Sequence, residues 1–499
     1  MTNLLSTISI SGKAFVYGTE NTRFMVRGIA LSATSTLNNN LNIKDILAND
    51  HNNLMVNTII PQLQLLNANC IRVYQVDPNN QHNLSMASLA SAGIYVMVGL
   101  ATSENSIKQM TGEYSQETFN HAARVVDEFQ AYDNTFCFSV GNEVEFPGQQ
   151  ASNLNTANPN TLPSQIVLDT VNLELTVAQA MKSFARDIKF HIAANNYRII
   201  PVGAAMQDGP QSSWGSSNPI LYQRGLIGTD IIAQYYTAGG ETDRMDYIGI
   251  NSYRYVTGST PPDSAYLGLG TEVQPLAVPV FLTETGGLGS VARDWKDVNS
   301  MYTVSSLYQQ LSGQVAFQML EEGAGYGLYT VGDNNALTTT ELGGAADLLQ
   351  AFSTVSTEPL NPVNSMPVAP TTAPASAGSP PFTITWPTDL LPLKIYSAPN
   401  AAITVNNYAT CNIQIVQQGV VMGTVSAATD GDNPVSASIQ VNSGVAISIQ
   451  GYVNSNWDAV CGVPASNVVD GITVSNDVDW GTNVQCNLMM TPVASFIQA

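Results

Sequence analysis

The chain has 499 residues, 44% of them hydrophobic and 11% charged, so it is long enough for a large core and a second domain. Its 38 acidic and 17 basic residues give a formal net charge of −21. This balance argues against nucleic acid and against an anionic membrane surface as partners, because both require a surface of Lys and Arg. The polar surface must consist mostly of Asn, Gln, Ser and Thr, which suits neutral sugars but also simple solubility.

No apolar run is long enough to span a membrane, and the first residues lack the basic and apolar regions of a secretory signal. Two of the five cysteines, Cys70 and Cys137, lie in apolar segments and are expected in the core. The other three, Cys411, Cys461 and Cys486, allow one disulfide and leave one thiol over, with no preferred pairing. No Cys or His cluster has the spacing of metal ligands, so we expect no metal site.

The first third of the chain begins with alternating polar and apolar residues and two hairpin turns, before a buried strand at 24–31. Strands then alternate with helical patterns. Buried strands are predicted to begin near residues 24, 70, 94, 135, 198, 245, 278 and 314, with helices near 54–67, 82–92, 115–130, 166–195, 228–238 and 295–311 and a loop at 145–165. Eight such units predict an α/β fold, a (β/α)8 TIM barrel, over residues 1–355.

The sequence changes character after the barrel. Residues 356–382 are rich in Pro, Ala, Ser and Thr, which predicts an extended linker. Residues 383–499 contain short Val, Ile and Thr strands separated by Asn, Gly and Asp turns, which predicts a small all-β sandwich. Its tryptophans, Trp386, Trp457 and Trp480, are candidates for a sugar-stacking platform, and core positions are at least as good an explanation for each.

Two predicted strands end in a glutamate. The strand at 135–144 ends in Gly141-Asn142-Glu143, and the strand at 278–287 carries Glu284 before two glycines. One such carboxylate could cap a helix or pair with an arginine. Two of them, at the ends of strands 4 and 7, would meet across the barrel mouth, where TIM barrels place catalytic residues. Glycosidases flank the scissile bond with a pair of carboxyl groups, so the pattern favours that chemistry.

Several segments carry a resemblance, in the same order along the chain, to a known family. The matching pieces are Ile71-Arg-Val-Tyr74 with Asp77-Pro78 and His82; Gly93-Ile-Tyr-Val96; Gly141-Asn-Glu-Val144; Arg186-Asp-Ile-Lys189; Tyr197-Arg-Ile-Ile-Pro-Val-Gly203; Asp246-Tyr-Ile-Gly-Ile-Asn-Ser-Tyr253; Pro279-Val-Phe-Leu-Thr-Glu-Thr-Gly286; Leu311-Ser-Gly313; and Tyr326-Gly-Leu328. Over about residues 10–352 the chain resembles the fungal β-1,3-glucanosyltransferases of glycoside hydrolase family 72, which elongate cell-wall β-1,3-glucan.

The resemblance implies a role for each matching position. Glu143 would be the acid/base and Glu284 the nucleophile of a retaining mechanism, whose carboxyl groups lie about 5–5.5 Å apart. Asn142 would bind the 2-hydroxyl of the reacting sugar, and Tyr74 and Tyr253 would line the cleft. The chemistry requires no organic cofactor. The implied partner is a β-glucan, and the implied location is extracellular or at the cell surface.

The chain also departs from the family pattern at sugar-binding positions. Ser32 stands where the family has glutamine, Gly99 where it has aspartate, and Phe317, taken here as substrate-binding, begins a changed run on strand 8. Thr285-Gly-Gly287 lacks the cysteine that usually follows the nucleophile. Three functions therefore stay open: a β-1,3-glucanosyltransferase or glucanase; a catalytically decayed barrel that serves as a structural or adhesive surface protein; and a glycosidase of other glycan specificity. The oligomeric state is not indicated.

Overall fold

The computed structural model describes residues 5–18, 22–32, 43–209, 228–258, 261–354 and 385–396, and in the C-terminal region 400–407, 412–417, 420–426, 435–442, 447–453, 456–463, 473–475 and 489–491. The predicted linker at 356–382 lies outside these residues, as do Cys411, Cys486 and Trp480. The chain forms two compact units, residues 1–77 with 82–394 and residues 78–81 with 395–499.

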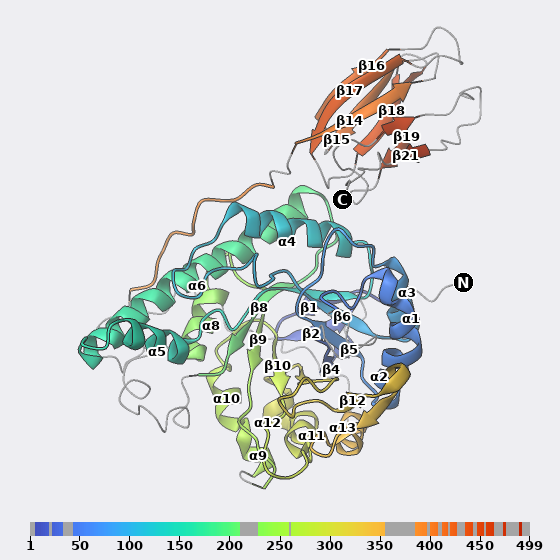
Figure 1. Cartoon of the computed structure of the whole chain (residues 1–499). Helices are drawn as coiled ribbons and strands as arrows, with labels where there is room; N and C mark the ends of the chain where they lie inside the picture. Colours follow the sequence, from blue (N-terminus) through green and yellow to red (C-terminus); the bar gives the residue numbers. More distant parts are fainter. Residues whose placement is uncertain are drawn as a thin grey trace, which may run out of the picture. The chain divides into compact units, whose positions relative to one another are not determined.

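The first unit is a closed barrel of eight parallel strands, which confirms the predicted TIM barrel (Figure 1). The strands are β4 (Val26–Ala30), β5 (Cys70–Val73), β6 (Tyr95–Gly99), β7 (Thr135–Asn142), β8 (Val202–Gln207), β9 (Tyr247–Asn251), β10 (Val280–Thr285) and β11 (Gly313–Ala316). They follow chain order around the barrel, and β11 pairs with β4 to close it. β7 and β10, which carry the two glutamates, therefore stand on opposite sides of the mouth.

A small antiparallel sheet precedes the barrel, as the two hairpin turns predicted. It contains β1 (Ile8–Ser11), β2 (Ala14–Tyr17) and β3 (Thr22–Phe24). Phe15 of β2 makes edge-to-face ring contacts with Phe136 and Phe281 of the barrel strands, at 4.7 and 5.7 Å between centroids. These aromatic rings share one buried core with the barrel strands, so the sheet packs against the amino-terminal half of the strands and leaves their carboxyl ends free for a site.

Helices separate the strands. The longer ones are α3 (Asn83–Ser91), α4 (Gln116–Phe129), α5 (Pro147–Ala157), α6 (Pro163–Ala194), α8 (Thr229–Thr237), α11 (Lys296–Thr303) and α13 (Ala345–Ser353). Shorter segments are α1 (Asn52–Leu54), the π-helix Met55–Ile59, α2 (Ile60–Leu65), α9 (Pro262–Ala265), α10 (Leu267–Glu272) and α12 (Ser305–Tyr308), with the hairpin β12 (Tyr329–Val331) and β13 (Leu337–Thr339). No described helix is both long and apolar enough to cross the bilayer.

The predicted loop at 145–165 was wrong, because α5 occupies Pro147–Ala157. Proline occupies a favourable position in its first turn, where no backbone donor is needed. The buried Ala151 then packs with Ile166 and Val167 of α6, so tertiary contact stabilises a segment whose Asn-rich composition disfavours a helix.

Residues 385–394 belong to the barrel unit, although the sequence analysis assigned them to the sandwich. Trp386 is 5% exposed and stacks on Tyr235 of α8, with 4.4 Å between ring centroids. The backbone oxygen of Leu391 accepts from Arg186 of α6 at 2.7 Å, and its amide donates to the Ser183 hydroxyl at 2.9 Å. Trp386 is thus a packing residue of the barrel unit and no part of a sugar platform in the sandwich.

The second unit contains two four-stranded sheets, in the orders β17-β14-β20-β21 and β16-β15-β18-β19. The strands are β14 (Asn400–Asn407), β15 (Ile413–Gln417), β16 (Val420–Val425), β17 (Val435–Asn442), β18 (Ile447–Val453), β19 (Asn456–Val463), β20 (Thr473–Ser475) and β21 (Met489–Thr491). Val405 and Ile439 of the first sheet share a buried core with Ile415 and Ile449 of the second. This shared core is that of a small β-sandwich, as predicted.

Candidate active site

The two predicted glutamates lie at the carboxyl ends of their strands. Glu284 is in β10, 6% exposed, and Glu143 follows β7 directly. Glu143 has a positive φ of 49°, which is uncommon for a residue with a side chain. Its amide donates to the Ala205 oxygen at 2.8 Å, and its own oxygen accepts from the Gln109 amide at 3.4 Å. These contacts hold the strained backbone at the strand end.

Three donors surround the Glu284 carboxylate. Its Oε1 accepts from Arg72 at 3.0 Å and from the Tyr74 hydroxyl at 2.8 Å, and its Oε2 accepts from the Tyr253 hydroxyl at 2.6 Å. Burial and the charge of Glu284 raise the pKa of both tyrosines well above the usual value, so they stay protonated and donate. The arrangement fixes the position of a carboxylate anion.

Two buried residues connect the two glutamates. Arg72 of β5 donates to Glu284 and also, at 2.6 Å, to the Asn142 side-chain oxygen. Asn251, at the end of β9, donates to the Asn142 oxygen and to Glu143 Oε1, both at 3.0 Å. The Asn251 side-chain oxygen accepts from Arg72 at 3.1 Å. The network therefore spans the mouth from β7 to β10.

The sequence analysis assigned no role to Arg72 or Asn251. Both carried a signal, since Arg72 is a charge inside an apolar strand and Asn251 is a polar residue at the end of a barrel strand. Arg72 is 2% exposed, and so is Asn251. A buried charge of this kind is expected only where a partner compensates it, and Glu284 is that partner.

The surroundings of Glu143 favour its protonated form. Burial, followed by the charge of Glu284, raises the pKa of Glu143 to about 7, although the hydrogen bond from Asn251 and the charge of Arg72 act in the opposite direction. A carboxyl group with a pKa near neutrality can both deliver and take up a proton at physiological pH. Glu143 therefore has the properties of a general acid and base.

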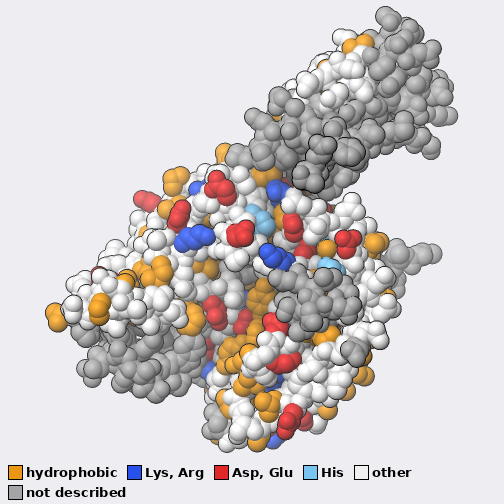
Figure 2. Space-filling model, viewed as in Figure 1, with side chains coloured by type: hydrophobic (Ala, Val, Ile, Leu, Met, Phe, Trp, Pro, Cys, Tyr) orange, Lys and Arg blue, Asp and Glu red, His pale blue; other side chains and the backbone are white. Residues whose placement is uncertain are grey.

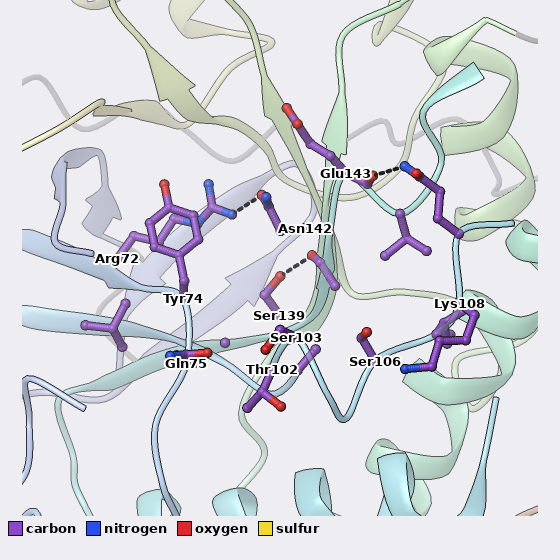
Figure 3. A pocket seen from close by; sticks show the side chains of 17 residues that line it. Arg72, Tyr74, Gln75, Thr102, Ser103, Ser106, Lys108, Ser139, Asn142 and Glu143 are labelled. Carbon is purple, nitrogen blue, oxygen red and sulfur yellow. Dashed lines mark hydrogen bonds between the residues drawn. The ribbon is translucent and has the colours of Figure 1, made fainter. Parts of the chain in front are cut away.

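A cavity of about 410 Å³ opens beside Asn142 and Glu143 (Figure 3). Its walls come from the ends of β5, β6 and β7 and from the loop after β6. The lining side chains are mostly hydroxyls and amides: Gln75, Thr102, Ser103, Ser106, Gln109, Ser139 and Asn142, together with Arg72, Tyr74 and Lys108. Figure 3 shows Arg72 joined to Asn142 at the rim, with Tyr74 beside them. This volume and this lining suit part of a carbohydrate.

The three positions that depart from the family pattern all lie around this mouth. Gly99 lines the cavity, and a Cβ atom there would lie 2.0 Å from the Tyr74 backbone oxygen, so the backbone admits only glycine. The Ser32 hydroxyl is hydrogen-bonded to the Gln318 side chain. Phe317 is half-buried and contacts the rings of Tyr253 and Tyr326 edge-to-face, at 6.3 and 5.3 Å. Phe317 thus forms part of an aromatic wall around Tyr253.

The remaining surface features agree with a neutral ligand. Figure 2 shows charged side chains scattered singly over the visible face, with polar side chains and backbone between them. Among the described residues, no three His, Cys, Asp or Glu side chains gather as a metal ion would require. The chemistry available at the mouth is therefore that of the carboxylates, tyrosines, Arg72 and amides.

Comparison with known proteins agrees with this geometry. The sequence profile of the glucanosyltransferases, glycoside hydrolase family 72, matches residues 1–158 and 165–352. The chain belongs to this glucanosyltransferase family. The matched residues cover most of the barrel unit, including both glutamates and the residues that connect them.

Individual glucanosyltransferases and related proteins are similar to the chain at moderate identity. The 1,3-beta-glucanosyltransferase gas5 of Schizosaccharomyces pombe is 31% identical over 342 residues, which are 66% of this chain and 57% of the relative. Protein EPD1 of Candida maltosa is 28% identical over 379 residues, 75% of this chain and 57% of the relative. The chain thus spans a little over half the length of these relatives.

Solved glucanosyltransferase structures share the fold. Saccharomyces cerevisiae Gas2p in complex with laminaritetraose and laminaripentaose has a TM-score of 0.58 and 23% identity, over 75% of this chain and 72% of that chain. Gas2p in complex with laminaripentaose has the same TM-score at 22% identity, over 75% and 74% of the two chains.

Proposed function

We propose that the chain is a retaining β-1,3-glucanosyltransferase that acts on a β-glucan through a covalent glycosyl-enzyme intermediate. The observation that carries the proposal is the pair of strand-end glutamates in different surroundings. Three donors hold Glu284 as a carboxylate, while burial and the neighbouring charge keep Glu143 protonated up to about pH 7. A nucleophile and a general acid require this difference.

In the first step, a Glu284 oxygen attacks the anomeric carbon of a sugar held at the mouth. The glycosidic C–O bond breaks, and Glu143 donates its proton to the leaving oxygen. Arg72, Tyr74 and Tyr253 release part of the negative charge they compensate as the new ester bond forms. Asn142 is exposed at the rim and is suited to bind the adjacent hydroxyl of the same sugar.

In the second step, Glu143 acts as a base. It takes the proton from a hydroxyl group of an incoming glucan chain, whose oxygen attacks the anomeric carbon, and the ester bond to Glu284 breaks. The result is a longer glucan and an unchanged enzyme. Water in place of the sugar hydroxyl would give hydrolysis instead, so the outcome depends on what the acceptor side of the cleft binds.

The substrate class is supported by the site and by the relatives. The relatives named above include a 1,3-beta-glucanosyltransferase, and Gas2p was solved with laminari-oligosaccharides. The cavity beside Glu143 offers hydroxyls and amides and little charge, as a neutral glucan requires. A cell-wall glucan also implies an extracellular or cell-surface location for the chain.

Product analysis by mass spectrometry tests this proposal. The protein and its Glu143→Gln variant are incubated with β-1,3-gluco-oligosaccharides of one defined length. We expect products both longer and shorter than the input from the protein, and none from the variant. Only shorter products would indicate a hydrolase, and no products at all would favour a binding role or another glycan.

A further inference from the structure

Asn251 has an unusual set of contacts for a residue that touches neither face of the open cavity. Its side chain is 2% exposed, and all its hydrogen-bonding capacity is used within the site. The side-chain oxygen accepts from Arg72 at 3.1 Å and from the Thr283 hydroxyl at 2.8 Å. The side-chain nitrogen donates to Asn142 and Glu143, both at 3.0 Å.

These contacts fix the orientation of the amide. Arg72 can only donate, so the group facing it must be the Asn251 oxygen. A flipped amide would place its N–H groups against that cation, and its oxygen against the oxygens of Asn142 and Glu143. One buried side chain is thus held by β5 and β10 on one side, and holds the end of β7 on the other.

We propose that Asn251 is the positioning residue that couples the two glutamates: it transmits the fixed geometry of Arg72 at Glu284 to the carboxyl group of Glu143. This inference rests on the proposed function, because it names what sets the acid. Glu143 needs such support, since its backbone is in the left-handed region and its side chain is only half-buried. Positioning within a fraction of an ångström strongly affects proton transfer.

The direction of the effect follows from the charges that face Glu143. These are Glu284 on β10, Arg72 and Tyr74 on β5 and the residues after it, and Tyr253 beyond β9. The hydrogen bond from Asn251 stabilises the carboxylate form and so lowers the pKa of Glu143, against burial and Glu284. Without Asn251, the pKa of Glu143 must rise, and its carboxyl group loses a fixed position.

The experiment measures the titration of Glu143 directly and the kinetics beside it. Protein labelled with ¹³C at glutamate Cδ is titrated by NMR, and Glu143→Gln assigns the signal. We expect Asn251→Ala to raise the midpoint by about one pH unit and to lower kcat about 10- to 100-fold with a smaller change in KM. Thr283→Val removes one of the two contacts that orient the amide and should give a smaller shift in the same direction.

Asn134→Ala is the matched control, because Asn134 is equally buried and its side chain donates to the backbone oxygens of Met86 and Ile94, away from the mouth. It should lower the melting temperature and leave the Glu143 midpoint unchanged. An unchanged midpoint in Asn251→Ala, with or without a fall in kcat, would overturn the inference. A protein that is inactive on glucan, yet shows the shifted midpoint, would refute the proposed function and support the positioning role.

Discussion

Glu143 and Glu284 are chemically identical side chains with opposite surroundings. Glu284 accepts from Arg72, Tyr74 and Tyr253, whereas the one side-chain donor observed on Glu143 among the described residues is Asn251. Glu143 therefore bears the cost of burial next to a like charge, and its pKa rises to about 7. The division of labour between acid and nucleophile comes from these neighbours.

The pKa of Glu143 predicts the alkaline side of the pH–activity profile. Glu143 must be protonated to cleave the glycosidic bond, so kcat/KM should fall about tenfold per pH unit above pH 7, with a midpoint near 7. Initial rates on a fixed oligosaccharide between pH 5 and 9 measure this. A profile that is flat from pH 6 to 9 would remove Glu143 from the role of acid.

The Tyr253 hydroxyl, 2.6 Å from Glu284, provides a second test at this scale. Tyr253→Phe removes one donor from the nucleophile and should lower kcat about 10- to 100-fold with little change in stability. Tyr255→Phe is the control, because the Tyr255 hydroxyl donates to Asp294 instead. Equal rates for the two variants would show that the hydroxyl of Tyr253 does not serve the nucleophile.

At the scale of elements, the close approach of β5 and β6 decides what the mouth can carry. Gly99 ends β6 against the Tyr74 backbone oxygen, with no room for a Cβ atom. The aspartate that the family pattern has at this position therefore cannot be introduced without moving the segment that carries Tyr74. The altered position reflects a different local backbone as well as a lost polar side chain.

We therefore expect Gly99→Asp to destabilise the protein by about 2 kcal/mol or more and to lower activity, because it displaces Tyr74 from Glu284. Urea unfolding and initial rates measure the two effects. Gly268→Ala in α10 is the control, since the nearest atom to its new Cβ would lie 3.5 Å away. A stable Gly99→Asp protein with increased activity would contradict this explanation of the glycine.

The elements also show what could be predicted from the sequence. The eight strands and the two strand-end glutamates were predictable, because apolar runs that end in a carboxylate are local patterns. Arg72 and Asn251 were missed as functional, because only the closed barrel brings β5 and β9 to the same point. The helix at Pro147–Ala157 was missed because its stability comes from α6 and not from its own composition.

At the scale of the whole molecule, the barrel unit continues beyond α13 to residue 394. The contacts of Trp386 with Tyr235, and of Leu391 with Arg186 and Ser183, place this segment along α6 and α8. Composition alone suggested that the sandwich starts at residue 383. The packing of one tryptophan could not be read from the sequence, because its partner lies about 150 residues earlier.

Trp386→Ala should therefore destabilise the barrel unit, by about 3 kcal/mol, through the lost stacking and the cavity left at Tyr235. The expected result is a lower melting temperature of the transition that also abolishes glucanosyltransferase activity. Leu393→Ala, at a position 39% exposed, should change that transition little. An unchanged melting temperature in Trp386→Ala would show that the segment contributes nothing to the barrel unit.

The most direct test of the central claim is to trap the covalent intermediate. The protein is incubated with a 2-deoxy-2-fluoro glucosyl donor that carries a good leaving group, and digested peptides are analysed by mass spectrometry. Glu284 as the nucleophile predicts a single glycosyl adduct on the peptide that contains it, and none in Glu284→Gln. A label on Glu143 or on any other residue, or an inverted anomeric configuration in the first product, would contradict the mechanism.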